Sequence, residues 1–282
     1  MKKGILLIAV GHENYTLMAA NLAAGIKYNC PAMQIALATD QPIPEQFNHL
    51  FTDVIQVPEE YYTTNGITEY IKVKTHMYDL SPFDKTIFLD VDMAWINKRN
   101  PEDLFTILNG IDFTIANTGV AGQSIWADIK EVKKAWKTDK PFYNYHSEFV
   151  YFKKCARVKR YFDKVKAVFD KPRVKGTSFG GARIADELAF QIASMVTGIY
   201  PHKDNFLPTF WWGRAVGTTQ FYQYPYQFDD SFFGYSIGGK ITPDWIAKNY
   251  NNLVGYYFKQ AKLTNPWFAK DKQKFIKNRQ NI

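Results

Sequence analysis

The chain has 282 residues, of which 46% are hydrophobic and 17% aromatic, with a net charge of +8 and a pI near 9.2. This composition is typical of a folded globular protein and excludes a disordered, collagen-like or disulfide-rich chain. Two cysteines without metal or redox spacing favour a reducing, cytoplasmic location. The apolar run at residues 4–10 is too short for a signal peptide, and no run reaches the roughly 18 apolar residues of a membrane span.

The first third of the chain alternates short apolar runs with helix-like patterns. In chain order we predict a strand at 4–10, a helix at about 13–28, a strand at 33–38, a proline-broken loop at 41–46, a short strand at 54–57 and a helix at about 68–80. Pro82 stops that helix, and another apolar strand begins at residue 85. This alternation predicts a layered α/β sheet with a ligand crevice at the carboxyl ends of its strands.

The strand that begins at residue 85 runs into Asp90-Val91-Asp92, two carboxylates one residue apart. Residues two apart in a strand face the same way, so Asp90 and Asp92 project together from its carboxyl end. Two carboxylates about 6 Å apart repel each other by roughly 3 kcal/mol at an effective dielectric constant near 20. A divalent cation relieves that repulsion, and hard oxygen ligands suit Mg²⁺ or Mn²⁺. The pattern predicts a metal site, with a solvated turn as the alternative.

The rest of the chain predicts fewer strands and a change in composition. In order we predict a short helix at 103–108, strands at 112–116 and 148–152, a basic helix at 155–169, a Gly-rich loop at 171–183 and a helix at 184–196. Twelve aromatic residues then crowd the segment 206–235. We therefore treat residues 1–200 as one unit, and residues 201–282 as an aromatic-rich region with a basic tail that belongs to the same domain.

Positive charge is concentrated in two blocks. Residues 153–175 hold ten Lys and Arg against two Asp, and residues 259–282 hold seven Lys and Arg against one Asp. The remainder of the chain is net acidic. Two basic blocks on an acidic body predict an anionic partner, either a nucleic acid or a membrane surface, with a solvated charged face as the alternative.

Four short segments stand out in a fixed order. They are Val-Gly-His-Glu-Asn-Tyr at 10–15, Leu-Ser-Pro-Phe-Asp-Lys-Thr-Ile-Phe-Leu-Asp-Val-Asp at 80–92, Asn-Tyr-His-Ser-Glu-Phe-Val-Tyr-Phe at 144–152 and Ala-Asp-Glu-Leu-Ala-Phe at 185–190. Together they resemble nucleotide-sugar-dependent glycosyltransferases of the GT-A fold, most nearly the glycogenin and galactosyltransferase type. The resemblance implies a Rossmann-like open mixed sheet flanked by helices, with a nucleotide-sugar-binding catalytic unit at 1–200 and an acceptor-side region at 201–282.

The resemblance also implies a metal-bound donor. Asp90 and Asp92 would hold Mn²⁺ or Mg²⁺ against the diphosphate of a UDP-sugar, with UDP-glucose as the favoured donor, and the cation would stabilise the departing nucleoside diphosphate. The family commonly supplies a third ligand, a His, where this chain has Ser236. Metal coordination then uses fewer protein ligands, or His12 or His202 substitutes.

Further residues are implied to contact the donor. They are Val10, Tyr15, Asp40, Lys72, Lys74, Asp90, Val91, Gly239 and Lys240. Tyr15 would stack on the base and Asp40 would bind the base or ribose. Either Lys74 or Lys72 would contact the base or phosphate, unless both simply occupy a solvated helix face.

Three acidic residues are candidates for the chemistry. Asp186 and Glu187 sit at a predicted helix N-terminus, where a capping role is the alternative. The resemblance places Asp186 against the hydroxyls of the donor sugar, and Glu148 is the other acidic candidate. An inverting enzyme needs one of these carboxylates as a base towards the acceptor hydroxyl. Retention and inversion both remain open at this point.

The favoured acceptor is a nucleic acid, because the basic blocks suit phosphates. The Lys-, Asn- and aromatic-rich style of the chain is similar to that of bacteriophage glycosyltransferases acting on hydroxymethylated DNA, which implies a host cytoplasm. The competing acceptor is a lipid-linked or cell-surface glycan, reached from an anionic membrane surface by the basic C-terminal tail. Outside this class, a phosphoryl-transfer enzyme lacks support from a phosphate loop, and a noncatalytic nucleic-acid-binding protein remains the alternative.

Overall fold

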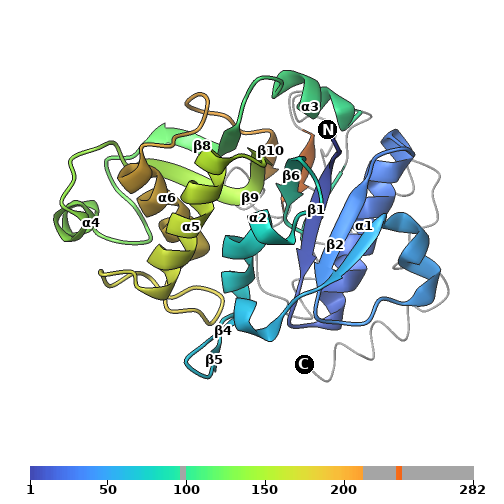
Figure 1. The fold of residues 1–282 in the computed structure, drawn as a ribbon, viewed down its shortest axis with the longest axis horizontal. Helices are drawn as coiled ribbons and strands as arrows, with labels where there is room; N and C mark the ends of the chain where they lie inside the picture. Colours follow the sequence, from blue (N-terminus) through green and yellow to red (C-terminus); the bar gives the residue numbers. More distant parts are fainter. Residues whose placement is uncertain (96–99, 212–232, 237–282) are drawn as a thin grey trace, which may run out of the picture.

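The computed structural model describes residues 1–95, 100–211 and 233–236, and a six-stranded mixed sheet forms its centre (Figure 1). In sheet order the strands are β3 (Asp53–Gln56), β2 (Ile35–Thr39), β1 (Lys3–Ala9), β6 (Lys85–Leu89), β9 (Tyr143–Lys153) and β8 (Phe113–Val120). The first four are parallel to one another. Strand β9 runs antiparallel to both of its neighbours, so β8 points the same way as β6. The predicted α/β fold with an open mixed sheet is confirmed.

The remaining elements connect or cover this sheet. The α-helices are α1 (Glu13–Asn29), α2 (Met77–Leu80), α3 (Glu102–Ile107), α4 (Ile129–Trp136), α5 (Ala156–Asp170) and α6 (Asp186–Thr197). The 3₁₀ helices are η1 (Glu45–Leu50), η2 (Glu59–Tyr61) and η3 (Tyr70–His76). A hairpin pairs β4 (Thr63–Thr64) with β5 (Ile67–Thr68), and a small sheet joins β10 (Thr209–Trp211), β11 (Gly234–Ser236) and β7 (Met93–Ala94).

Helices cover both faces of the sheet because its inner strands are apolar on both sides. In β1, Ile5 and Leu7 belong to the core that contains α1 and α3, whereas Leu6 and Ile8 belong to the core that contains α5 and α6. Successive side chains of a strand point to opposite faces, so a continuous apolar run is the pattern of a strand buried on both faces. Figure 1 shows α1 on one side of the molecule and α5 beside α6 on the other.

Several elements differ from the sequence-based expectation. The predicted helix at 68–80 is instead the 3₁₀ helix η3 followed by the single turn α2. In the first part of this segment every second residue is β-branched (Ile71, Val73 and Thr75), and β-branched side chains lose rotamer freedom in an α-helix. Part of the predicted loop at 41–46 belongs to η1, and β8 and β9 are longer than expected. Helix α4 and the β4–β5 hairpin were not predicted. Among the described helices, none is long and apolar enough to cross a membrane.

Candidate active site

Polar side chains gather where the parallel strands end. Val10 follows β1, Asp40 follows β2 and Asp90 follows β6. Because these three strands are parallel, the residues that follow them meet at one edge of the sheet. Strand β9 passes β6 in the opposite direction, and the backbone N–H of Asp90 donates to the carbonyl oxygen of Glu148 at 3.1 Å. The acidic pair after β6 and the acidic residue of β9 are therefore neighbours.

Lys74 stands at the centre of an acidic cluster. Its ammonium donates to Asp90 Oδ2 at 2.8 Å and lies 3.5 Å from Asp186 Oδ2 and 3.5 Å from Ser147 Oγ. Ser147 Oγ in turn donates to Glu187 Oε1 at 3.1 Å. Burial alone would lower the pKa of Lys74, but the carboxylates of Asp186, Asp90 and Glu187 outweigh it and hold that pKa well above its usual value. One ammonium therefore joins the end of β6, strand β9 and the start of α6.

The cluster contains more carboxylate oxygens than this ammonium can satisfy. Within the part of the chain that the structure describes, Asp92 Oδ1, Glu148 Oε1 and Glu187 Oε2 are buried without a hydrogen-bond partner. The side chain of Asp186 is 1% exposed, and its Oδ2 forms an ion pair with the Lys74 ammonium at 3.5 Å. Buried polar groups are normally paired, so several unpaired carboxylate oxygens in one place indicate a binding site for a cation or for hydrogen-bond donors.

Burial and mutual repulsion shift the acidity of this cluster. Burial raises the pKa of Asp92 to about 7, with the Asp90 charge as the next cause. Burial likewise raises the pKa of Glu148 to about 8 and, with help from Asp186, that of Glu187 well above its usual value. Part of the cluster is therefore protonated near neutral pH when no cation is bound.

The oxygen atoms of the acidic pair are suitable ligands for a hard divalent cation. Asp90 and Asp92 offer carboxylate oxygens, and Oδ1 of Asp92 is one of the unpaired buried atoms. In the described residues, no group of three or more His, Cys, Asp and Glu side chains is arranged as a metal site. Strand β11 pairs with β7 so that Ser236 lies opposite Met93. The segment in which the resemblance expects a third ligand therefore runs beside the chain that follows Asp92.

The residues predicted to bind the nucleotide lie on the β1–β2 side of this cluster. The carboxylate of Asp40 accepts from the backbone N–H of Gly11 at 2.9 and 3.1 Å. Gly11 has a φ of +86°, and a Cβ there would approach the Tyr70 ring to 2.8 Å, so this tight turn requires glycine. Tyr15 is half-buried and lies near the acidic pair. Burial raises its pKa to about 12, and the neighbouring charge of Asp92 is the next cause. Asp40 and Tyr15 thus flank the acidic cluster.

Other predicted residues are placed differently. The side chains of Val10 and Val91 are buried in the core, so their main chain is what a ligand can reach. His12 caps α1, its Nδ1 accepting from the Asn14 N–H, and His202 contacts Thr114 on β8. The structure thus brings neither histidine into the set of contacts around Lys74. Gly239, Lys240 and the basic tail lie outside the described residues.

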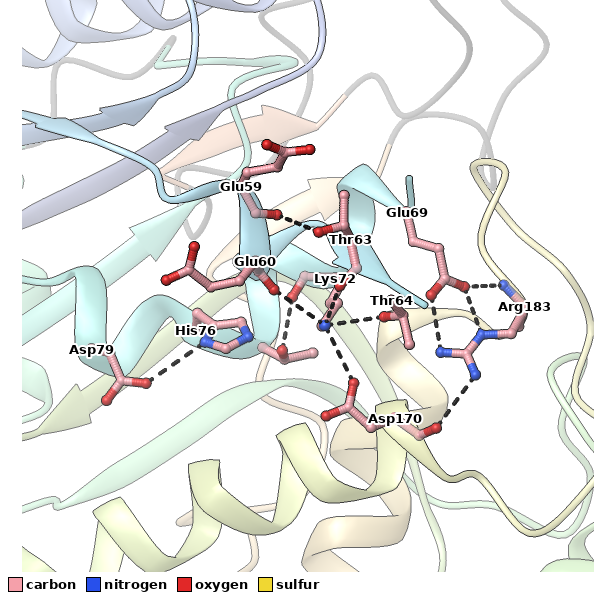
Figure 2. A network of polar contacts seen from close by, with 11 residues as sticks. Glu59, Glu60, Thr63, Thr64, Glu69, Lys72, His76, Asp79, Asp170 and Arg183 are labelled. Atoms are coloured by element: carbon pink, nitrogen blue, oxygen red, sulfur yellow. Dashed lines mark hydrogen bonds and ion pairs between the residues drawn. The ribbon is translucent and has the colours of Figure 1, made fainter. Parts of the chain in front are cut away.

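Lys72, two residues before Lys74, belongs to a separate network (Figure 2). Its ammonium donates to the carbonyl oxygens of Glu60 and Thr63 at 3.3 and 2.8 Å and to Thr64 Oγ1 at 3.0 Å, and it lies 3.4 Å from Asp170 Oδ1. These contacts tie η3 to the β4–β5 hairpin and to the end of α5. Lys74, not Lys72, is the lysine that faces the acidic cluster.

Beside Lys72, an ion pair between the buried carboxylate of Glu69 and the partly exposed guanidinium of Arg183 holds the chain just before α6. The Arg183 backbone N–H and Nε both donate to Glu69 Oε1 at 2.9 Å, and Nη2 donates to Oε2 at 2.9 Å. The side chain of Glu69 is completely buried, and Arg183 Nη1 also donates to the Asp170 carbonyl oxygen at 3.3 Å. Figure 2 shows these contacts between Glu69 and Arg183. Because Glu69 immediately precedes η3 and Asp186 follows Arg183 by three residues, the pair links the start of α6 to the segment that carries Lys74. Sequence reasoning missed both residues.

Comparison with solved structures identifies the fold as GT-A, as the sequence resemblance implied. The bifunctional glycosyltransferase WbbM superposes with a TM-score of 0.62 at 12% identity, over 100% of this chain and 52% of that one. The galactosyltransferase LgtC, solved with donor and acceptor sugar analogues, has a TM-score of 0.53 at 13% identity over 92% of this chain and 99% of its own. The chain spans about half the length of WbbM.

The glycosyltransferase GlyE of Streptococcus pneumoniae TIGR4 gives a TM-score of 0.50 at 12% identity, over 93% of this chain and 66% of that one. No protein-family model matches the sequence, and no curated protein matches it. At these identities the comparisons establish the fold, while the activity is argued from the site itself.

Proposed function

We propose that this protein is a metal-dependent glycosyltransferase that moves a hexose from a UDP-sugar, with UDP-glucose as the favoured donor, to an acceptor hydroxyl. The observation that carries the proposal is the acidic cluster around Lys74, with its unpaired carboxylate oxygens, at the carboxyl edge of a GT-A sheet. That edge is where open α/β sheets bind nucleotides. The solved structures named above are glycosyltransferases on the same fold.

The donor diphosphate would lie over the acidic pair. Asp90 and Asp92 would hold Mn²⁺ or Mg²⁺, which supplies Lewis-acid stabilisation of the leaving diphosphate when bound. Asp92, whose pKa burial raises to about 7, would be held in its ionised form by a cation shared with Asp90, which would also relieve the repulsion between the two carboxylates. Tyr15 and Asp40, on the β1–β2 side, would contact the base and ribose. Lys74 would orient the Asp90 carboxylate.

The donor sugar would then face the carboxylates of β9 and α6. Asp186 and Glu187 begin α6, and Glu148 lies beside Asp90. We place Asp186 on the sugar hydroxyls, since Lys74 holds its carboxylate towards the acidic pair. Glu148, with a pKa of about 8, is suited to exchange a proton with an acceptor hydroxyl, because that pKa lies close to neutral pH. Glu187 is the alternative for that role.

A nucleic acid is the favoured acceptor. The first basic block spans the end of β9, α5 and the loop after it. Part of its charge is paired with acidic side chains: Lys153 and Arg157 with Asp112, and Lys159 with Asp163. In the described part of the chain Arg160, Lys171 and Lys175 make no ion pair and are exposed. Those cations are available to phosphates. Glycans and membranes are the competing partners.

Turnover of the donor alone tests the proposal. The protein is incubated with a panel of UDP- and GDP-sugars and Mn²⁺, and release of the nucleoside diphosphate is measured with and without EDTA. We expect slow release from one UDP-hexose that EDTA abolishes and that Asp92→Ala removes. Release from no donor would refute the glycosyltransferase function and leave a noncatalytic nucleic-acid-binding protein as the better account. Hydroxymethylcytosine DNA, plain DNA and oligosaccharides are then ranked as acceptors by their gain in mass.

A further inference from the structure

A cavity of about 700 Å³ opens between two loops at the outer end of the sheet. Residues 122–130 line one side, from the loop after β8 into the first turn of α4, and residues 175–177 line the other, from the loop between α5 and α6. Thr177 joins the loops, its N–H donating to the Trp126 carbonyl oxygen and its Oγ1 to that of Ile125, both at 2.8 Å. The volume is that of a site for a small-molecule-sized group.

The sheet order places this cavity across the acidic cluster from the residues predicted to bind the nucleotide. Strand β8 points the same way as β6, so the loops that follow the two strands leave from the same edge. Along that edge the nucleotide-side residues follow β1 and β2, the acidic pair follows β6, and the cavity lies beyond β8. Figure 1 shows α4 at the opposite end of the molecule from α1. The chain from Lys175 runs directly on to Asp186, which links the cavity to the acidic cluster.

The lining is cationic, although it includes one carboxylate. Asp128 is its single acidic residue, and Asp128 Oδ1 is engaged in capping α4, accepting from the Lys130 and Glu131 N–H groups at 2.8 and 3.4 Å. Lys130 and Lys175 are exposed, and neither makes an ion pair in the described part of the chain. Two unpaired ammonium groups around one cavity favour an anionic ligand.

Aromatic rings adjoin these cations. Trp126 lines the cavity and meets Phe179 edge to face, with ring centroids 5.4 Å apart. Phe179 does not line the cavity but adjoins it through Trp126, and it is 46% exposed although it is large and apolar, so an aromatic surface remains accessible beside the cavity. Exposed aromatic rings beside cations are the combination that proteins use to stack unpaired bases while binding the phosphates between them.

We propose that this cavity binds a single nucleic-acid strand, the acceptor of the proposed glycosyl transfer on which this inference rests. Lys130 and Lys175 bind backbone phosphates, and Trp126 with Phe179 contacts a base. A concave polar cavity admits one unpaired nucleotide, whereas a lipid bilayer would meet a flat or protruding apolar face. The strand would leave the cavity towards α6, where Asp186 begins the helix.

Charge reversal tests the proposal by direct binding. The full chain is titrated against a fluorescent single-stranded oligonucleotide of about 12 nucleotides, at salt concentrations from about 50 to 200 mM, and anisotropy is measured. The double variant Lys130→Glu, Lys175→Glu should bind at least about tenfold more weakly than the unmodified chain and show a smaller salt dependence. Trp126→Leu should weaken binding without changing the salt dependence. Thermal unfolding of each variant confirms that it is folded.

Lys134→Glu is the matched control, because Lys134 is exposed on the same helix and does not line the cavity. It should bind the oligonucleotide within about threefold of the unmodified chain. Equal binding by the double variant, or binding only to a neutral oligosaccharide or to anionic phospholipid vesicles, would overturn the proposal. Donor hydrolysis by the unmodified chain is measured in parallel. Its absence refutes the glycosyltransferase function, whereas hydrolysis together with cavity-independent binding refutes this inference alone.

Discussion

The surroundings of Lys72 and Lys74 differ in one physical respect, although the two lysines belong to the same 3₁₀ helix. Around Lys72 most charged groups are paired: the ammonium has three hydrogen-bond acceptors, and both oxygens of neighbouring Glu69 are held by Arg183. The exception in this network is the ring of His76, whose two buried nitrogens have no hydrogen-bond partner among the described residues. Around Lys74 carboxylates outnumber cations and several buried oxygens have no partner. Fully paired buried groups stabilise one structure, whereas unpaired ones are tolerated where a ligand completes them. The comparison separates scaffold from site.

The largest expected effect comes from Asp92→Asn, which keeps the shape of the side chain and removes its charge. Metal-dependent nucleotide release should fall by about 10²–10³-fold, the usual consequence of losing one charge-stabilising group in an active site. The free energy of unfolding should stay the same or rise, because a buried carboxylate with an unpaired oxygen is removed. Turnover assays and urea unfolding measure the two quantities.

Asp163→Asn is the control for that experiment, since Asp163 makes exposed ion pairs with Lys159 and Lys166 on α5. It should leave nucleotide release unchanged and cost at most about 1 kcal/mol of stability. If Asp92→Asn released nucleotide at the full rate, the cluster with unpaired carboxylate oxygens would not be the site that binds the sugar nucleotide.

Replacing Lys74 or Lys72 by methionine tests directly whether the two lysines have different roles. Lys74→Met should lower nucleotide release about tenfold or more, because Asp90 and Asp186 lose their shared cation. Lys72→Met should leave turnover within about threefold and reduce the free energy of unfolding by roughly 2 kcal/mol, because three backbone and hydroxyl acceptors lose their donor. The same assays on both variants decide the matter. A larger loss of turnover in the Lys72 variant would contradict the assignment of Lys74 to the site.

Glu69→Gln weakens the paired region. The guanidinium of Arg183 would keep a neutral partner in place of a buried carboxylate, so we expect a loss of about 2 kcal/mol in the free energy of unfolding; the partial exposure of Arg183 limits the cost. Because Arg183 holds the chain before Asp186, donor turnover should fall as well, with a smaller change in donor KM. Urea unfolding and steady-state kinetics give both numbers. Glu60→Gln is the control, because Glu60 belongs to the same network but its side chain is exposed. It should change neither the free energy of unfolding nor donor turnover.

Sequence patterns predicted those parts of the candidate site that depend on neighbouring residues in the chain. The apolar run before Asp90 was enough to place the acidic pair after the carboxyl end of β6. The expectation that strand alternation orients Asp90 and Asp92 together was wrong, because β6 ends at Leu89 and residues 91 and 92 form a turn. The choice between Lys72 and Lys74 stayed open, since it depends on which tertiary neighbours each side chain meets. The Glu69–Arg183 pair joins residues 114 positions apart, and no spacing rule connects them.

The same reasoning explains the outcome for the fold. The strands of the sheet were predictable because apolar runs such as residues 4–10 are buried on both faces. The helix expected at 68–80 became η3 because β-branched residues, and the hydrogen bonds of Lys72 to the hairpin, outweigh the helical pattern. Helix α4 escaped prediction, since it is eight residues long and buries only Val132 fully.

The last expected effect is a pH dependence of the free energy of unfolding, to which the acidic cluster and the half-buried His76 ring contribute with opposite signs. The folded pKa values of Asp92 and Glu148, about 7 and about 8, lie above their unfolded values near 4. Between these limits Asp92 and Glu148 hold more protons in the folded protein than in the unfolded chain, whereas His76, whose pKa burial lowers to about 4, holds fewer below about pH 6.5. Stability without metal should therefore fall most clearly as pH rises from about 6.5 to about 8. Thermal unfolding at a series of pH values measures this slope, which Asp92→Asn should reduce. In the proposed site Mn²⁺ would bind the ionised carboxylates, so it should raise the unfolding temperature more at pH 8 than at pH 6. A pH-independent Mn²⁺ shift would contradict a cation site built on Asp92. Glu69→Gln, in the paired region, should leave the Mn²⁺ effect as it is.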